Sequence, residues 1–207
     1  QFRCNGSNSY LDWLEFILGY TNKERILRKD DDFDFRIFKS PKTLYHEITK
    51  KENIKGNSAR LTAGFCWEWS NHLDENGELI KDVKIGDFEM PWETHMSIKK
   101  IPDGYVPWYQ WGYRKEGIKQ VGCIYTAQGF EFDYIGVLFG KDFRYNKDQD
   151  RLVGDFKNNK DPMLKDNEMF EQYVRNIYRV LMTRGLKGCY VYFLDKDTED
   201  YFRRYME

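Results

Sequence analysis

Hydrophobic positions recur along the chain with two periods, and the changes between these periods predict alternating strands and helices. Residues 10–18 place apolar side chains at helical spacing, and Gly19 follows them as a residue that ends helices. Residues 33–38 alternate apolar and charged side chains, which predicts a strand. Ser40 and Pro41 then open a predicted helix that carries Leu44 and Ile48.

The middle of the chain departs from this regularity. Residues 60–67 predict a strand interrupted by Gly64, whose missing side chain often marks close backbone approach. From residue 70 to residue 119, Trp, Pro and Gly occur among charged residues, and Asn76-Gly77 is a two-residue hairpin signal. We therefore expect residues 70–119 to form a β-rich insertion, called the excursion below.

Regular periods return after the excursion. Residues 122–126 and 134–139 are short apolar segments that predict two strands with a polar loop between them. Residues 144–166 are polar and predict a surface loop. A helix is then expected over residues 169–183, a strand over residues 189–194, and a final helix from Thr198. This succession predicts one layered α/β domain with a largely parallel central sheet.

Composition and charge narrow the class of protein. Among the 207 residues, 33 basic and 34 acidic side chains give a formal net charge of -1, so we expect nucleic-acid binding by this chain alone to be weak. No apolar run approaches the roughly 20 residues of a membrane-spanning helix. We expect a cytoplasmic protein without a membrane partner. The four cysteines are scattered, with no pair at metal-ligand spacing, and are expected to be reduced and structural.

Two segments imitate nucleotide-binding motifs without meeting their chemical requirements. Residues 136–142 resemble a phosphate-binding loop, but only three residues separate the two glycines. Asp142 also stands where a Ser or Thr hydroxyl would coordinate magnesium, and its carboxylate would repel phosphates. The apolar strand that ends at Asp195 resembles a magnesium-binding aspartate motif, but we interpret it as a strand followed by a capped helix. The three histidines lie in no recognisable nucleophile motif, and metal ligands are not expected.

Two later segments carry a more specific signal. They read Thr126-Ala-Gln-Gly-Phe-Glu-Phe-Asp133 and Tyr178-Arg-Val-Leu-Met-Thr-Arg-Gly185. The first resembles motif V of superfamily 1 helicases and the second resembles motif VI, while the opening Gln1-Phe2-Arg3 is similar to motif IV. The chain is also similar to the Schlafen group 3-like DNA/RNA helicases of bacteria, through Gly64-Phe-Cys-Trp-Glu-Trp-Ser70 and Gln120-Val-Gly-Cys-Ile-Tyr125.

This resemblance implies the second, C-terminal RecA-like domain of an ATP-dependent helicase or translocase, over residues 1–207 with the excursion at about 70–119. ATP and Mg²⁺ would be held mainly by an N-terminal RecA-like domain of the same protein, which we expect to lie outside this chain. DNA or RNA, in single-stranded form, is the implied partner. The chain alone is expected to bind ATP poorly and to be inactive, whereas the full-length protein is expected to hydrolyse ATP.

The resemblance also implies roles for individual residues. Arg184 and Arg3 would act as arginine fingers on the γ-phosphate, since a guanidinium holds two phosphate oxygens with a permanent charge. Glu131, beside Gly129, would accept a hydrogen bond from a ribose hydroxyl. Gln128 has two open interpretations, as a coupling residue between nucleotide and nucleic acid and as an ordinary loop amide. The other interpretation of Arg184 is a cation that stabilises its own helix end.

Two residues are candidates for nucleic-acid contact, Thr126 in the motif V segment and Trp67. Trp67 and Trp69 can stack on bases or cover a core, and covering is the favoured interpretation. Two other functions stay open for the chain: a non-catalytic interaction module that keeps a RecA-like fold, and part of a small-molecule NTPase. We expect Arg3, Glu131 and Arg184 to meet at the carboxyl ends of the strands, with Arg184 partly exposed toward a partner domain.

Overall fold

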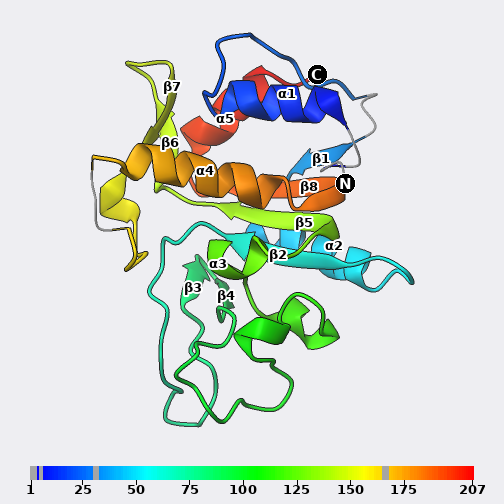
Figure 1. Ribbon diagram of the computed structural model, residues 1–207, viewed down its shortest axis with the longest axis vertical. Helices are drawn as coiled ribbons and strands as arrows, with labels where there is room; N and C mark the ends of the chain where they lie inside the picture. Colours follow the sequence, from blue (N-terminus) through cyan, green and yellow to red (C-terminus); the bar gives the residue numbers. More distant parts are fainter. Residues whose placement is uncertain (1–3, 5–6, 30–32, 165–167) are drawn as a thin grey trace.

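A four-stranded parallel sheet forms the centre of the molecule (Figure 1). The computed structural model describes residues 4, 7–29, 33–164 and 168–207. Within them the strand order is β1-β8-β5-β2, with β1 at Asp34–Ile37, β8 at Gly185–Phe193, β5 at Phe132–Phe139 and β2 at Ala59–Ala63. This arrangement confirms the predicted α/β class and is consistent with a RecA-like fold.

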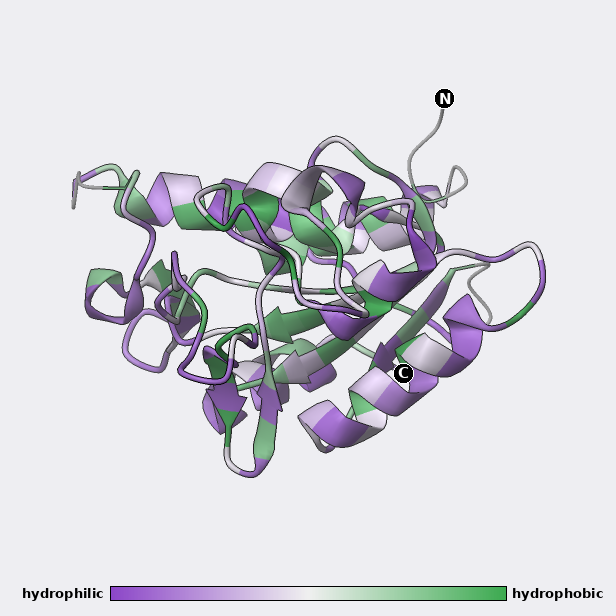
Figure 2. Ribbon diagram, turned by 90° about the horizontal axis from the view of Figure 1, so that it is seen from below, coloured by the Kyte–Doolittle hydropathy of each residue, from purple (hydrophilic) through white to green (hydrophobic). Residues whose placement is uncertain are grey.

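Helices cover both faces of this sheet. Side chains of α1 (Asn8–Ile17), α4 (Phe170–Met182) and α5 (Lys196–Arg204) pack into one hydrophobic cluster with Ile135, Val137 and Val191. Helix α2 (Pro41–Glu52) packs Leu44 and Ile48 against the other face, which includes Leu138. Hydrophobic residues concentrate on the central strands and hydrophilic residues on the outer surfaces of the helices (Figure 2). The alternation of the strands thus gives each helical layer its own core.

Local sequence signals explain where the first helices begin and end. Ser40 caps α2 by accepting a hydrogen bond from the backbone N–H of Thr43, and Pro41 fills the first turn. Gly19 follows α1 with a φ of 82°, a conformation that glycine adopts without a side-chain penalty. Gly64 marks a close approach, since a Cβ atom there would lie 1.9 Å from the Tyr178 hydroxyl. These three predictions are confirmed.

The excursion lies at the end of the molecule away from α1 and α5 (Figure 1). It contains a short antiparallel hairpin of β3 (Val83–Ile85) and β4 (Phe88–Met90), and 3-10 turns at Trp108–Gln110 and Lys115–Lys119. Asn76-Gly77 forms a turn between Leu73 and Leu79, which are joined by an antiparallel bridge. The buried guanidinium of Arg60 in β2 donates to the carbonyls of Trp111 and Arg114, at 2.8 and 2.6 Å. One strand residue therefore attaches the excursion to the sheet.

Two sequence predictions are wrong in part. Residues 122–126 were predicted as a strand, but only residues 121 and 122 form β-bridges and helix α3 (Ile124–Ala127) follows. Residues 144–166 were predicted as a loop, but β6 (Phe143–Asn146) and β7 (Arg151–Gly154) form a hairpin, followed by a 3-10 turn at Phe156–Asn158. The hairpin forms because Phe143 and Leu152 are buried in the core shared with α4 and α5.

Candidate functional site

The segments similar to motifs V and VI meet at the amino ends of β5 and β8. These strands are parallel neighbours, and Phe132 pairs with Gly185 at the start of their ladder. The backbone N–H of Phe132 donates to the carbonyl of Arg184 at 2.8 Å. The Arg184 guanidinium donates from Nη1 to the carbonyls of Gln128 and Phe130, at 3.2 and 3.3 Å, and its Nε donates to Val180. The end of α4 is thus bonded directly to the loop before β5.

Two expectations about Arg184 are wrong. Arg184 is only 4% exposed, whereas we predicted a partly exposed side chain. The cause is local, because the guanidinium turns back onto carbonyl oxygens of its own domain. The meeting point is also at the amino ends of the strands and not at their carboxyl ends. Both segments precede the strands they lead into, so the usual position of ligands in open α/β sheets does not apply to them.

The remaining predicted nucleotide contacts are arranged around Arg184 to different degrees. Gln128 and Gly129 are exposed and Glu131 is half-buried, and all three lie in the short loop whose carbonyls accept from Arg184. Arg3 lies outside the described residues. The structure therefore brings together Arg184 with the loop of Gln128, Gly129 and Glu131, and leaves the arginine of the motif IV-like segment as a prediction.

Residues 136–142 do not fit a phosphate-binding loop. Gly136 lies inside β5, and β6 follows Asp142 where a phosphate loop would lead into a helix. The Tyr178 hydroxyl accepts from the Gly140 N–H at 2.8 Å and donates to Asp142 Oδ1 at 2.6 Å. Burial raises the pKa of Asp142 to about 6, against the lowering effect of the hydrogen bond from Tyr178. This carboxyl group is part of the core and faces no phosphate.

Asp195 has the structural role that was expected of it. Its Oδ2 accepts from the backbone N–H and the hydroxyl of Thr198, at 2.9 and 2.6 Å. It is the N-cap of α5, so the strand it follows does not present it as a magnesium ligand.

A buried carboxylate that the sequence did not reveal lies beside the motif V-like segment. Glu93, in the excursion, is 1% exposed. Its Oε1 accepts from the Thr126 hydroxyl at 2.7 Å and from the Cys123 N–H at 3.3 Å. Its Oε2 is buried and has no hydrogen-bond donor among the described residues. Burial raises the pKa of Glu93, and the bonds from Cys123 and Thr126 oppose that shift. The sequence did not predict a site residue at Glu93, because the residues around it follow no regular pattern.

Glu93 lines a hydrophobic pocket of about 410 Å³, which we call the aromatic pocket. Its other lining residues come from the end of β2, the excursion, α3 and the loop before α4, namely Phe65, Trp69, His95, Met96, Trp108, Tyr125, Thr126, Asp161, Pro162 and Met163. Two of these residues are bonded to each other, since Tyr125 donates to Asp161 Oδ2 at 2.7 Å. The two segments that resemble Schlafen group 3-like helicases, residues 64–70 and 120–125, therefore both contribute to this pocket.

The two candidate nucleic-acid contacts differ in their surroundings. Thr126 is buried and its hydroxyl donates to Glu93. Trp67 is half-buried, donates from Nε1 to the Lys84 carbonyl at 3.0 Å, and packs against the ring of Trp92. These contacts fit the covering interpretation of Trp67.

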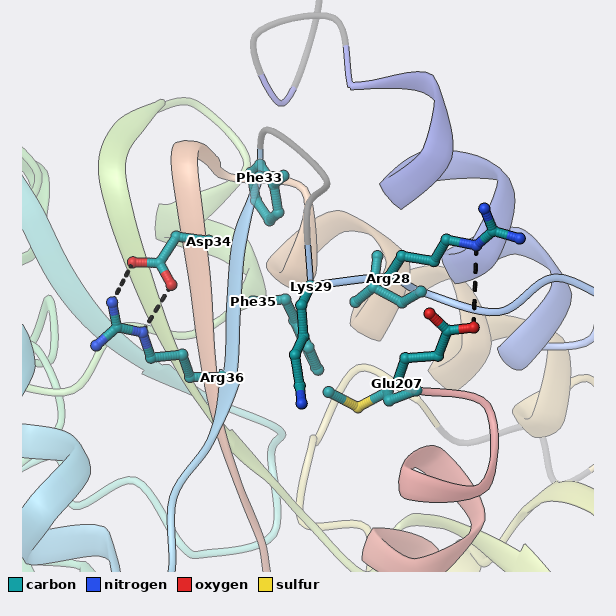
Figure 3. Close-up of a pocket in the computed structure, with 9 residues that line it drawn as sticks. Arg28, Lys29, Phe33, Asp34, Phe35, Arg36 and Glu207 are labelled. Carbon is teal, nitrogen blue, oxygen red and sulfur yellow. Dashed lines mark hydrogen bonds and ion pairs between the residues drawn. The ribbon is translucent and has the colours of Figure 1, made fainter.

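A second hollow, of about 320 Å³, lies beside β1 at the opposite edge of the sheet (Figure 3). Two ion pairs lie in its charged walls, which also include Lys29. The Arg36 guanidinium bonds Asp34 at 2.7 and 2.9 Å, and Arg28 lies 4.0 Å from Glu207. The hollow lies beside β1, which pairs directly with β8, so that Asp34 stands opposite Gly188, three residues after the motif VI-like segment ends at Gly185. We assign it no chemistry.

Neither a metal site nor a membrane span is found in the part of the chain that the structure describes. No group of three or more His, Cys, Asp or Glu side chains there is arranged to hold a metal ion. No described helix is both long enough and apolar enough to cross a membrane.

Comparisons with known proteins identify the family of this chain. Residues 1–195 match the family model described as Schlafen group 3, DNA/RNA helicase domain. An uncharacterised protein of Saccharomyces cerevisiae is 25% identical over 221 aligned positions, which cover 97% of this chain and 46% of the yeast protein. The chain thus spans about half the length of this relative, and no solved structure matches it. A helicase domain implies the use of a nucleoside triphosphate and a nucleic-acid partner. The chain belongs to the Schlafen group 3 DNA/RNA helicase domain family.

Proposed function

We propose that this chain is the C-terminal motor half of an ATP-dependent DNA or RNA helicase or translocase. In this proposal, ATP and Mg²⁺ are held by a second RecA-like domain of the same protein, and this chain completes the site from the other side. Arg184 contacts the γ-phosphate, and Glu131 contacts the ribose. The observation that carries the proposal is the direct bonding of Arg184 to the loop of Gln128 and Phe130, which joins the segments similar to motifs V and VI.

The lack of a phosphate-binding loop in these 207 residues supports the proposal that another domain holds ATP. The chain contains no G-x-x-x-x-G-K-[ST] segment, and the segment most like it ends in the buried carboxyl of Asp142. Residues able to contact ATP are instead on the loop before β5 and at the end of α4. Such a chain can supply charge and orientation to a nucleotide but cannot enclose its phosphates alone.

The burial of Arg184 defines what must happen for it to reach ATP. Its Nη1 donates to two neutral carbonyls at 3.2 and 3.3 Å, which is long for hydrogen bonds of a charged group. A phosphate group is a stronger acceptor, because it carries negative charge and two of its oxygens can accept from one guanidinium at once. We infer that closure of the two domains exchanges these carbonyls for phosphate oxygens. The exchange would release the loop of Gln128 and so link nucleotide state to the motif V segment.

The first experiment measures ATP turnover by the full-length protein with and without single-stranded DNA and RNA. A motor that moves along nucleic acid is expected to hydrolyse ATP faster when the strand is present. Turnover that is unchanged by either nucleic acid would contradict the motor and favour a small-molecule NTPase. The nucleic acid that stimulates more strongly identifies the substrate.

A second candidate function is a non-catalytic nucleic-acid or protein interaction module that keeps the fold. The buried position of Arg184 favours it, because the bonds that join α4 to the loop before β5 give the guanidinium a structural role that needs no nucleotide. The same turnover assay separates the two candidates. Nucleic-acid binding without any ATP turnover is the result expected of the module.

A further inference from the structure

The aromatic pocket has the chemistry of a site for a flat, polar-edged ligand. Its walls include the rings of Phe65, Trp69, Trp108 and Tyr125, and it is large enough for a small ligand. Of the described large hydrophobic side chains that are exposed, Met96, Trp108, Tyr125 and Met163 gather around this one pocket. Exposed aromatic and methionine side chains that line one hollow are typical of a binding surface.

Glu93 supplies a second, independent observation. Its carboxylate lines the pocket, and its Oε2 has no donor among the described residues, although the side chain is almost fully buried. A buried acceptor without a donor is costly unless a ligand or water completes it. On the protein side, Cys123 and Thr126 already occupy Oε1. A ligand that carries an N–H group and enters the pocket can supply the missing donor.

We propose that the aromatic pocket receives one unpaired base of the DNA or RNA strand, with its face on the aromatic walls and its N–H edge on Glu93. This inference rests on the proposed nucleic-acid function and adds a base-recognition site to it. Guanine fits best, since its N1–H and N2–H groups stand side by side and can both point to a carboxylate. Uracil and thymine fit worst, because carbonyl oxygens flank their single N–H group.

Charges of both signs surround the pocket, with the carboxyl groups of Glu93 and Asp161 in its wall and lysines outside it. A neighbouring hollow of about 250 Å³ shares His95, Met96 and Trp108 with the pocket and is also lined by Lys99. Lys160 lies beside the pocket wall, since its backbone N–H donates to the Phe65 carbonyl. The Lys160 ammonium pairs with Glu68 at 3.3 Å, so Lys99 is the nearby cation that can attract a phosphate next to a bound base.

The position of the pocket gives base binding a direct connection to the nucleotide side. Thr126 lies in the pocket wall and bonds Glu93. Two residues later the Gln128 carbonyl accepts from Arg184. The segment from Thr126 to Gln128 thus lines the pocket at one end and contacts Arg184 at the other.

The test is fluorescence anisotropy of the protein with labelled 12-nucleotide oligothymidine strands at about 50 mM salt, without ATP. One strand carries a single central guanine, and the reference strand has none. We expect the guanine strand to bind on the order of tenfold more tightly, as a stacked and hydrogen-bonded base contributes. Trp108→Ala is expected to remove most of this preference. Tyr173→Ala, a similarly exposed aromatic on α4, is the matched control and should keep it.

Glu93→Gln tests the hydrogen bond itself. It keeps an oxygen for Thr126 and Cys123 and places an NH₂ group where Oε2 lies, so the guanine preference should disappear while binding of oligothymidine is unchanged. Equal affinity for the two strands, or an undiminished preference in Glu93→Gln, would overturn the pocket assignment alone. Failure to bind any strand would refute the proposed function as well. Quenching of tryptophan fluorescence by tetramethylammonium but not by guanosine monophosphate would identify a cation site instead and also overturn the proposal.

Discussion

Replacing Asp142 by Asn should change how the stability of the protein depends on pH. The carboxyl group is 2% exposed and accepts from Tyr178 at 2.6 Å. Burial is the largest cause that raises its pKa from 3.8 to about 6. The folded state therefore binds more protons than the unfolded state between these two values. The stability that protonation contributes is fully present below pH 3.8 and is lost as the pH rises through 6.

The magnitude follows from the size of the shift. A difference of about two pKa units, at 1.36 kcal/mol per unit, corresponds to about 3 kcal/mol of unfolding free energy. Asp142→Asn cannot ionise and does not carry this dependence. The stability of the variant relative to the wild type should therefore rise by about 2 kcal/mol between pH 4 and pH 7, the larger part of the whole change. Any hydrogen bond that the amide makes poorly shifts this difference by a constant and leaves its pH dependence unchanged.

Urea unfolding of both proteins at several pH values measures the difference directly, because their other titrating groups cancel. Asp150→Asn is the matched control of opposite sign. Asp150 is exposed, and the hydroxyl of Tyr145 and then the guanidinium of Arg204 lower its pKa. Its contribution is present at neutral pH and lost as the pH falls. A stability difference between Asp142→Asn and wild type that does not vary with pH would refute the reasoning.

Two further substitutions test the packing that positions the site. Arg60→Ala removes the cation that lies 2.9 Å from the largely buried carboxylate of Glu52, and should cost about 3 to 5 kcal/mol of unfolding free energy. Lys187→Ala is the control, because its ion pair with Asp133 is more exposed, and it should cost under about 1 kcal/mol. Equal costs in urea unfolding would contradict the anchoring role of Arg60. Gly64→Ala should lower stability by about 1 to 3 kcal/mol, because the new methyl group meets the Tyr178 hydroxyl, and the loss should shrink when Tyr178→Phe is added in a double-mutant cycle.

The sequence predicted elements whose signals are local and missed those that distant residues determine. The α2 start at Ser40 and Pro41 was predictable because a cap needs only its own helix. Residues 122–126 were not, since apolar residues there fit a strand, and the bonds from Cys123 and Thr126 to Glu93 hold them as a helical turn. Sequence order alone could not tell that this carboxylate lies beside them.

In the candidate site, too, some features could be predicted from local sequence and others depend on tertiary packing. Motif similarity identified Arg184 and the loop of Gln128, and their contact bears out the expectation that these two segments meet. Their location at the amino ends of β5 and β8, and the burial of the guanidinium, depend on how α4 packs onto the sheet. Arg60, between apolar residues in β2, was a local signal of buried polar structure that the sequence did contain.

The central claim is that Arg184 acts on ATP. Its most direct test is nucleic-acid-stimulated ATP turnover by the full-length protein that carries Arg184→Lys. Lysine keeps the charge but cannot hold two phosphate oxygens at once. We predict a fall in kcat on the order of 10³-fold with ATP affinity much less affected, since the arginine acts mainly in the transition state. Arg179→Ala, on the same helix and paired at the surface with Glu15, should retain turnover within about threefold, the size expected from losing an exposed ion pair. A folded Arg184→Lys protein whose stimulated kcat equals that of Arg179→Ala would contradict the account.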